Sequence, residues 1–156
     1  MSILEERRNL MLNNFTKFRA QTLANLALLS TRSVDKGPQY DDDELYYNAL
    51  DSLMTLILVG YYYALADTKE YNIAAKGKTI AEVKDMFYDL VDKGVLELEV
   101  PEYVEYCLEE YLDGKRTKDL EDYPTIETLQ RGFGDVLIFI DTVDKYFGFE
   151  GVLKDG

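Results

Sequence analysis

The chain of 156 residues has no histidine, no tryptophan and a single cysteine, Cys107. Histidine is the usual general base and the commonest nitrogen ligand of metals, so its absence excludes hydrolases built on histidine. One cysteine can form neither an internal disulfide nor a structural zinc site. We therefore expect a protein that is not an enzyme and has no catalytic residue, no cofactor and no metal site.

Long hydrophobic runs are also missing. The most apolar stretch, residues 53–66, has 14 residues and contains Thr55 and Gly60, whereas a membrane-spanning helix needs about 20. The start of the sequence also lacks the features of a secretory signal, which are a positively charged region, an apolar core and a cleavage site with small residues. The sequence predicts a cytoplasmic protein without membrane contact, folded as one domain over residues 1–156.

Basic residues are scarce, and they are unevenly placed. The whole chain has 17 basic and 30 acidic side chains, but residues 1–37 carry six basic and three acidic ones. The remaining residues, 38–156, carry 11 basic and 27 acidic side chains. This division predicts one mildly basic helix that can meet a partner, on a chain that otherwise repels nucleic acid and anionic membranes.

Apolar residues recur at helical spacing in five segments, which are residues 4–31, 44–66, 80–93, 102–112 and 124–147. Thr79 and Glu82 predict a capping box at the start of the third segment. The second segment is apolar on nearly every side and should be the central helix. Residues 95–100 alternate, but no second strand is available to pair with them, so they predict an extended connector. The fold class is an all-α, single-domain bundle.

Three further expectations concern helix faces. The first helix should turn a polar stripe to solvent, opposite its apolar face, with Arg7, Asn14, Lys17, Gln21, Asn25 and Arg32. The inward positions of all five helices read as apolar. Gly132 and Gly134 lie inside the last helix, where glycine costs about 1 kcal/mol relative to alanine, so both suggest close approach of a neighbouring helix.

The chain has 13 tyrosines, a residue favoured in interfaces because one end is apolar and the other forms hydrogen bonds. The fourth predicted helix combines tyrosines and glutamates on its expected outer side. The predicted protein interface consists of Glu102, Tyr103, Glu105, Tyr106 and Glu109. An ordinary solvated surface explains the glutamates equally well, and tyrosine can serve as filler of a small core.

The opening residues Leu4-Glu5-Glu6-Arg7-Arg8 resemble the start of the small helical subunit of Cmr-type (type III-B) CRISPR ribonucleoproteins. A second similarity is Gly60, which precedes Leu65 and Ala66 in the apolar second helix. The last helix after residues 122–123 also resembles the closing helix of that family, although the family often has a tryptophan there and this chain has none.

This resemblance implies a non-catalytic subunit of an antiviral ribonucleoprotein, with protein subunits and guide or target RNA as partners. Phosphate contacts require lysine or arginine. The family motif carries RNA binding over to Arg7 and Arg8, and the charge distribution adds Lys17 and Arg19. Opposed basic and acidic faces would also allow head-to-tail self-association.

Two alternatives remain open. The second helix, the connector, the helix of residues 80–93 and the turn at residues 118–123 also resemble HEPN-domain bundles. Those domains often cleave RNA with an arginine and a histidine that have four to six residues between them. Arg116 is available here but no histidine is, so a binding role alone would remain. The other alternative is an acidic protein that mimics nucleic-acid phosphates and inhibits an enzyme, with Glu102, Glu105 and Glu109 in the mimicking surface.

Overall fold

Helices make up the fold. The computed structural model describes residues 2–36, 40–114 and 124–153, which form six helices and no strand. The helices are α1 (Ile3–Lys36), α2 (Tyr40–Ala64), α3 (Glu70–Ala74), α4 (Ile80–Asp92), α5 (Glu102–Gly114) and α6 (Ile126–Tyr146). The prediction of an all-α bundle is confirmed. Within the described residues, none of the helices has the length and apolar character that crossing a membrane requires.

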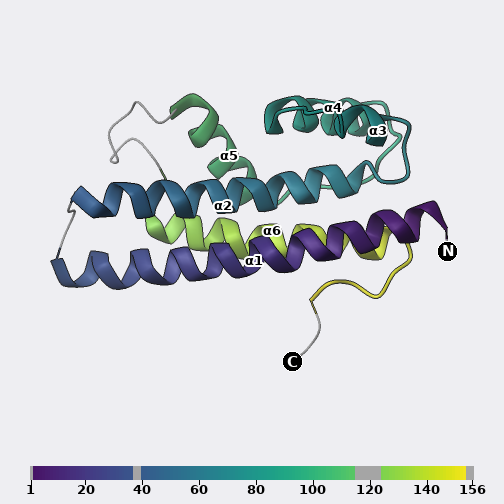
Figure 1. Ribbon diagram of the computed structural model, residues 1–156. Coiled ribbons are helices and arrows are strands. Elements are labelled where there is room, and N and C mark those ends of the chain that lie inside the picture. The colour runs from purple at the N-terminus through teal and green to yellow at the C-terminus, as the bar shows by residue number, and fades with distance from the viewer. Residues whose placement is uncertain (1, 37–39, 115–123, 154–156) are drawn as a thin grey trace.

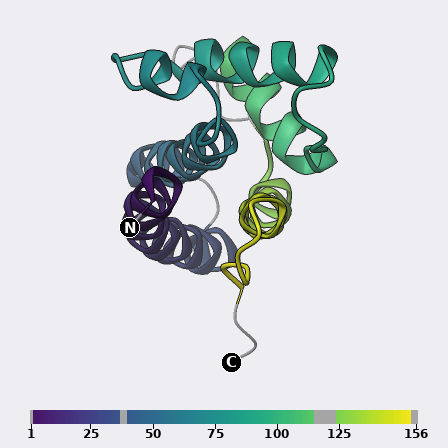
Figure 2. The same cartoon turned by 90° about the vertical axis from the view of Figure 1, so that its right-hand side faces the viewer.

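Three long helices, α1, α2 and α6, lie side by side and enclose the core (Figures 1 and 2). The shorter helices α3, α4 and α5 lie on one side of this bundle, where α4 packs on α2 and α5 packs mainly on α6 (Figure 2). The end-on view places α1 on the side away from that layer. The described part of the chain therefore leaves the outer side of α1 uncovered.

The central position predicted for the second helix is confirmed at α2. Ala49, Leu50, Leu53, Leu56 and Ile57 are completely buried, and α2 contacts α1, α4, α5 and α6. Burial of such aliphatic side chains contributes about 1.5–3 kcal/mol each relative to exposure. Helix α2 is the element around which the others pack.

The first helix is longer than predicted. It begins with a capping box, in which Ser2 Oγ accepts the Glu5 N–H (3.1 Å) and Glu5 Oε1 accepts the Ser2 N–H (3.3 Å). It continues to Lys36, beyond the end near Thr31 that the sequence predicted. Residues 37–39 lie outside the described residues, as do Arg116 and the segment 118–123 named above.

The elements after α2 are shorter. The five-residue helix α3 was not predicted, because so short a helix shows no periodicity. Its Tyr71 stacks on Tyr62 of α2, with 4.3 Å between the ring centroids. The capping box of Thr79 and Glu82 is confirmed at the start of α4. Residues 95–100 form the predicted connector without strand structure.

One of the two predicted close helix approaches is present. A Cβ atom at Gly132 of α6 would lie 2.7 Å from the Cys107 sulfur of α5, so only glycine fits there. The prediction for Gly134 is wrong, since a Cβ atom at that position would meet nothing within 4 Å. The two glycines differ because α5 packs against the side of α6 that carries Gly132, whereas Gly134 lies on a side with open space.

Candidate interaction surface

Asp144 on α6 is a completely buried carboxylate with several hydrogen-bond donors. Arg8 of α1 binds it with both arms of the guanidinium, Nε to Oδ1 at 2.8 Å and a terminal nitrogen to Oδ2 at 2.9 Å. Tyr63 of α2 donates its hydroxyl to the same carboxylate at 2.5 Å. The site joins α1, α2 and α6, and it corrects the prediction that all inward positions are apolar.

The protonation of the two partners follows from this arrangement. The hydrogen bond to Asp144 raises the pKa of Arg8, against the opposing effect of partial burial. Burial is the main cause that raises the pKa of Tyr63, and the Asp144 carboxylate adds to it. Arg8 is therefore a cation and Tyr63 a neutral donor at neutral pH, which is the combination that a buried carboxylate needs.

Asp141 and Asp144, one turn apart on α6, also hold the chain that follows this helix. We call residues 147–153 the C-terminal segment. Gly151 donates its N–H to Asp144 Oδ2 (3.0 Å), and Val152 and Leu153 donate theirs to Asp141 Oδ1 (2.9 and 3.0 Å). Burial opposes the charge on Asp141, but these bonds and Lys145 outweigh it and lower the pKa of Asp141. The segment is fixed by two carboxylates.

The arginines predicted to bind RNA have partners within the chain. Arg7 donates to the Ala66 carbonyl (2.7 Å) and stacks over the Tyr71 ring at 4.1 Å. Arg8 pairs with Asp144, packs over the Phe149 ring at 4.6 Å, and keeps only 17% of its side chain exposed. Both residues attach α1 to the rest of the fold. Their role in RNA binding stays a prediction.

Lys17 and Arg19 are the exposed members of the predicted RNA-binding set. Lys17 lies 5.2 Å from the Phe18 ring centroid and Arg19 lies 5.8 Å from that of Phe15, both on the same helix. These contacts with neighbouring rings leave the charged groups at the surface. The structure does not gather the four predicted residues into one patch.

The predicted interface on α5 divides in the structure. Glu102 and Glu109 are exposed, and Tyr106 is 46% exposed. Glu105 is half-buried and accepts the hydroxyl of Tyr88 on α4, so it is not part of a solvated face. Burial, followed by the bond to Glu105, raises the pKa of Tyr88. Glu105 thus joins α4 to α5.

Tyr103, also predicted at the interface, is half-buried and lies against α6. The guanidinium of Arg131 lies 5.2 Å from its ring centroid and donates to its hydroxyl at 2.5 Å. This contact supports the packing of α5 on α6. Of the five residues predicted for the interface, Glu102, Tyr106 and Glu109 are the three with an exposed side chain.

A small pocket of about 150 Å³ lies between α4 and α5 and includes Tyr61, Tyr88 and Glu105 in its lining. The Tyr61 hydroxyl is buried and makes no hydrogen bond to the residues that the structure describes. Burial raises the pKa of Tyr61 to about 12, against a smaller opposing effect of Tyr88. The tyrosine hydroxyls in the pocket are therefore neutral at neutral pH, and the charged residues of its lining are Lys84, Glu105 and Glu109.

Cys107 faces the interior between α5 and α6 and is completely buried. Burial raises the pKa of its thiol to about 12, and the nearby charge of Asp135 adds to the effect. Since the thiolate is the nucleophilic form, this cysteine is unreactive at neutral pH. Its position against Gly132 gives it a packing role.

Helix α1 carries an uncovered apolar surface within the described residues. From Ala20 to Thr31 the chain has no charged residue, although 30% of all residues are charged. We define the α1 outer face as the side chains of this stretch that are exposed to solvent, namely Ala20, Gln21, Leu23, Ala24, Ala27, Leu28 and Thr31. Leu23 is 58% and Leu28 53% exposed. The alanines lie between the two leucines on the helix surface.

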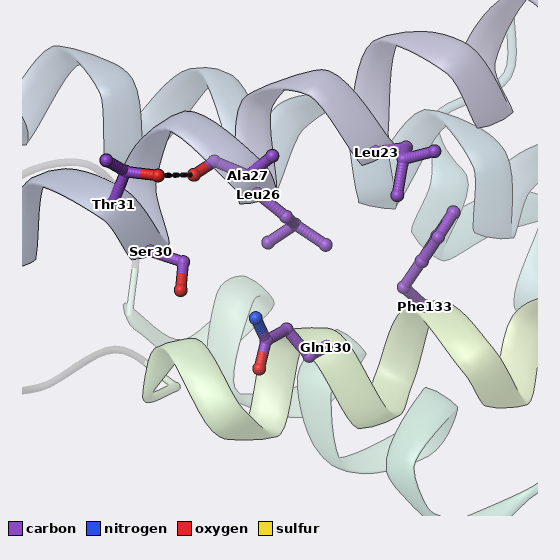
Figure 3. A pocket seen from close by; sticks show the side chains of 7 residues that line it. All are labelled: Leu23, Leu26, Ala27, Ser30, Thr31, Gln130 and Phe133. Carbon is purple, nitrogen blue, oxygen red and sulfur yellow. Dashed lines mark hydrogen bonds between the residues drawn. The ribbon is translucent and has the colours of Figure 1, made fainter.

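An open groove continues this face toward α6. It has a volume of about 610 Å³ and is lined by Leu23, Leu26, Ala27, Ser30, Thr31, Gln130 and Phe133. Figure 3 shows Leu23, Leu26 and Ser30 of α1 opposite Gln130 and Phe133 of α6. The α1 outer face and the groove together form a continuous uncharged surface that the rest of the described chain does not cover.

The polar stripe predicted for the solvent-facing side of α1 is confirmed in part, since Lys17 and Gln21 are exposed. Asn25, assigned to the polar stripe, donates to Ser52 Oγ on α2 at 2.9 Å, and Arg7 of the same stripe bonds to Ala66. Part of the polar stripe therefore packs against the neighbouring elements. The missed signal was the absence of charge between Ala20 and Thr31, which is visible in the sequence.

Comparisons with known proteins find no relative of this chain. No protein-family model, no curated protein and no solved structure matches it.

Proposed function

We propose that this protein is a non-catalytic interaction subunit that binds a helical protein partner through the α1 outer face and the adjoining groove. The observation that supports the proposal most is the exposure of Leu23 and Leu28 within a stretch of 12 residues that has no charge. The two leucines lie beside an open groove, so the apolar surface continues from α1 toward α6. A partner helix that covers them removes this surface from water.

The state of the buried ionisable groups supports a role in binding rather than catalysis. Asp144 is completely buried and forms an ion pair with Arg8. The thiol of Cys107 has a raised pKa and packs against the neighbouring helix. Catalytic groups lie in clefts with a pKa suited to their task. The polar groups described here instead hold helices together.

The narrower identification as a small subunit of a type III CRISPR complex stays a prediction. With Arg7 and Arg8 engaged inside the fold, phosphate contact would depend on Lys17 and Arg19. The uncharged α1 outer face suits a protein neighbour in such a complex, because phosphate recognition needs cations that this face lacks. The acidic mimic also stays a prediction, with Glu102 and Glu109 as its exposed carboxylates.

Affinity capture from cells that produce the protein tests the proposal, with the recovered proteins identified by mass spectrometry and any RNA sequenced. The test variant is Leu28→Glu, and the matched control is Ile138→Glu on α6. The two side chains are 53% and 52% exposed, so the substitutions change apolar area and charge alike.

We expect the wild type and Ile138→Glu to recover the same protein partner and Leu28→Glu to lose it. Recovery of the partner by all three proteins would refute the role of α1. Short guide RNAs among the recovered molecules would favour the CRISPR identification. Recovery of a nuclease or polymerase that depends on Glu102 and Glu109 would favour the acidic mimic.

A further inference from the structure

A second groove lies between α1 and α2, and it shares no lining residue with the groove beside α6. It consists of two hollows of about 410 and 350 Å³ that meet at Phe18 and Thr55. We call the two hollows together the α1–α2 groove. Its polar half includes Gln21, Asn25, Asn48, Asp51 and Ser52 in its lining. Its apolar half includes Leu58, Val59, Tyr62 and Val83, together with Asn14 and Lys78.

Amide side chains gather in this groove. The chain has six asparagines and three glutamines, and four of these nine residues line the groove, namely Asn14, Gln21, Asn25 and Asn48. Asn25 is engaged in the fold, since its NH₂ group donates to Ser52 Oγ at 2.9 Å. The side-chain amides of the other three form no hydrogen bond within the described residues. Each amide is donor and acceptor at once, so it matches the C=O and N–H of a peptide unit.

The two halves of the groove carry opposite charges. Asp51 is the charged residue in the lining of the polar half, and Lys78 is the charged residue in the lining of the apolar half. Asp51 accepts the Tyr111 hydroxyl at 3.4 Å, which leaves its negative charge in place. Lys78 lies 3.4 Å from Glu82, and both side chains are at least 36% exposed. Exposed ion pairs are weak, so the Lys78 ammonium is available to a ligand.

We propose that the α1–α2 groove binds the extended carboxyl-terminal tail of a partner protein. The last residue of this tail is apolar and has its side chain in the apolar half and its carboxylate at Lys78, whereas a basic residue nearer its start meets Asp51. An apolar side chain and a carboxylate occur on one residue only at the end of a chain, and proteins bind such ends as a recurring recognition mode.

The length of the groove sets the length of the tail. From Asp51 to Tyr62, α2 rises roughly 17 Å, which corresponds to about five extended residues. A peptide backbone is uncharged between its ends, as the middle of the groove is. Single-stranded nucleic acid would bring one phosphate per nucleotide to a groove lined by one cation, so it fits less well. This second site does not depend on the proposed function, and Gln21 is the residue that it shares with the α1 outer face.

A pool of N-acetylated pentapeptides is the probe, with lysine first, leucine last, a free carboxylate and random uncharged residues between them. Purified protein retains the binding members, which mass spectrometry identifies, and NMR titration of the best member gives its dissociation constant. We expect a value below about 1 mM. The side-chain NH₂ signals of Asn14, Gln21 and Asn48 should shift, whereas that of Gln130 in the groove beside α6 should not.

Two threonines provide a matched pair of variants. Thr55 lies where the two halves meet, and Thr142 lies on α6 outside the groove. Each hydroxyl donates to the carbonyl four residues earlier at 2.8 Å, so the two substitutions remove the same bond. Thr55→Tyr should obstruct the groove and weaken binding at least about tenfold, whereas Thr142→Tyr should change it less than about twofold. Circular dichroism checks that both variants remain helical. If Thr55→Tyr fails to fold, Gln21→Ala and the control Gln130→Ala, both at exposed glutamines, replace the pair.

Changes in the peptide test its placement. A carboxamide in place of the carboxylate should weaken binding to the wild type about threefold and leave binding to Lys78→Ala unchanged. Glycine in place of the last leucine should weaken binding about tenfold, because the apolar half would lose its occupant. Glutamate in place of the first lysine should weaken binding to the wild type more than binding to Asp51→Asn.

Three results would overturn the inference. The first is a pool from which the protein retains no peptide at about 1 mM. The second is binding that the groove variant and its control weaken equally, or a preference for the free carboxylate that Lys78→Ala keeps. The third is tighter binding of a five-nucleotide uridine RNA, lost in Thr55→Tyr, which would assign the groove to nucleic acid. None of these results bears on Leu28, so the proposed function is tested separately by its affinity capture.

Discussion

Replacement of Arg8 by alanine should destabilise the fold, because it leaves the buried carboxylate of Asp144 without its cation. Removal of one partner from a buried ion pair costs about 3–5 kcal/mol of unfolding free energy. Asp144 would keep the hydroxyl of Tyr63 and the N–H of Gly151 as donors, and Arg8 is 17% exposed in the wild type. We therefore expect a loss at the lower end, about 3 kcal/mol.

Such a loss would be large for this chain. Domains of this size are stable by about 5–15 kcal/mol, and 1 kcal/mol corresponds to about 3 °C of melting temperature. Arg8→Ala should thus lower the melting temperature by roughly 10 °C. The assay is urea unfolding followed by circular dichroism at 222 nm, with the free energy extrapolated to water and the m value compared with that of the wild type.

Arg19→Ala is the matched control, since it removes the same side chain from the same helix at an exposed position. Arg19 lies over the Phe15 ring at 5.8 Å and has no ion pair in the described chain, so its loss should change stability by less than about 0.5 kcal/mol. Equal effects of the two substitutions, or a loss below about 1 kcal/mol for Arg8→Ala with an unchanged m value, would refute the structural role of the pair.

Two further predictions concern α6. Gly132→Ala should destabilise the protein by about 1–3 kcal/mol, because the new Cβ atom would lie 2.7 Å from the buried Cys107 sulfur. Gly134→Ala should stabilise it by about 0.5–1 kcal/mol, because the space around its Cβ atom is open. Urea unfolding measures both changes. Acid should release the C-terminal segment, because the pKa of Asp141 is lower in the folded protein than its ordinary value of 3.8. The resulting stabilisation is complete at pH values above the ordinary pKa, and it is lost as the pH falls through the lower pKa of the folded state. NMR would detect this release through the amide chemical shifts of the segment, followed from about pH 6 to about pH 2, a range that contains the ordinary pKa of a carboxyl group.

Each of these predictions has its own contradiction. Similar effects of alanine at the two glycine positions would show that helix propensity, rather than the contact with α5, decides both. For the acid transition the control is Asp141→Asn, which keeps an acceptor oxygen but does not titrate. A transition that persists unchanged in this variant would assign the release to another group.

The sequence predicted those parts of the fold that depend on neighbouring residues. The spacing of apolar side chains in α4 and α6 marks their buried faces, and Thr79 with Glu82 marks a helix start within four residues. Such signals are local, since a helix face and a capping box are defined by positions three and four residues apart. The same reasoning explains why Gly132 was identified as a packing position and Gly134 was identified wrongly, because periodicity places both inside α6 but does not say which side a neighbour covers.

The sequence by itself also determined the composition of any interaction surface, since the stretch from Ala20 to Thr31 has no charge in any fold. Only the tertiary structure decided that this stretch is exposed and that Arg7 and Arg8 are occupied. The pair of Arg8 and Asp144 joins positions 136 residues apart, and no local pattern encodes a contact at that separation. The side of α1 that remains free is set by where α2 and α6 pack, because the covered sides of a helix are defined by its neighbours in space.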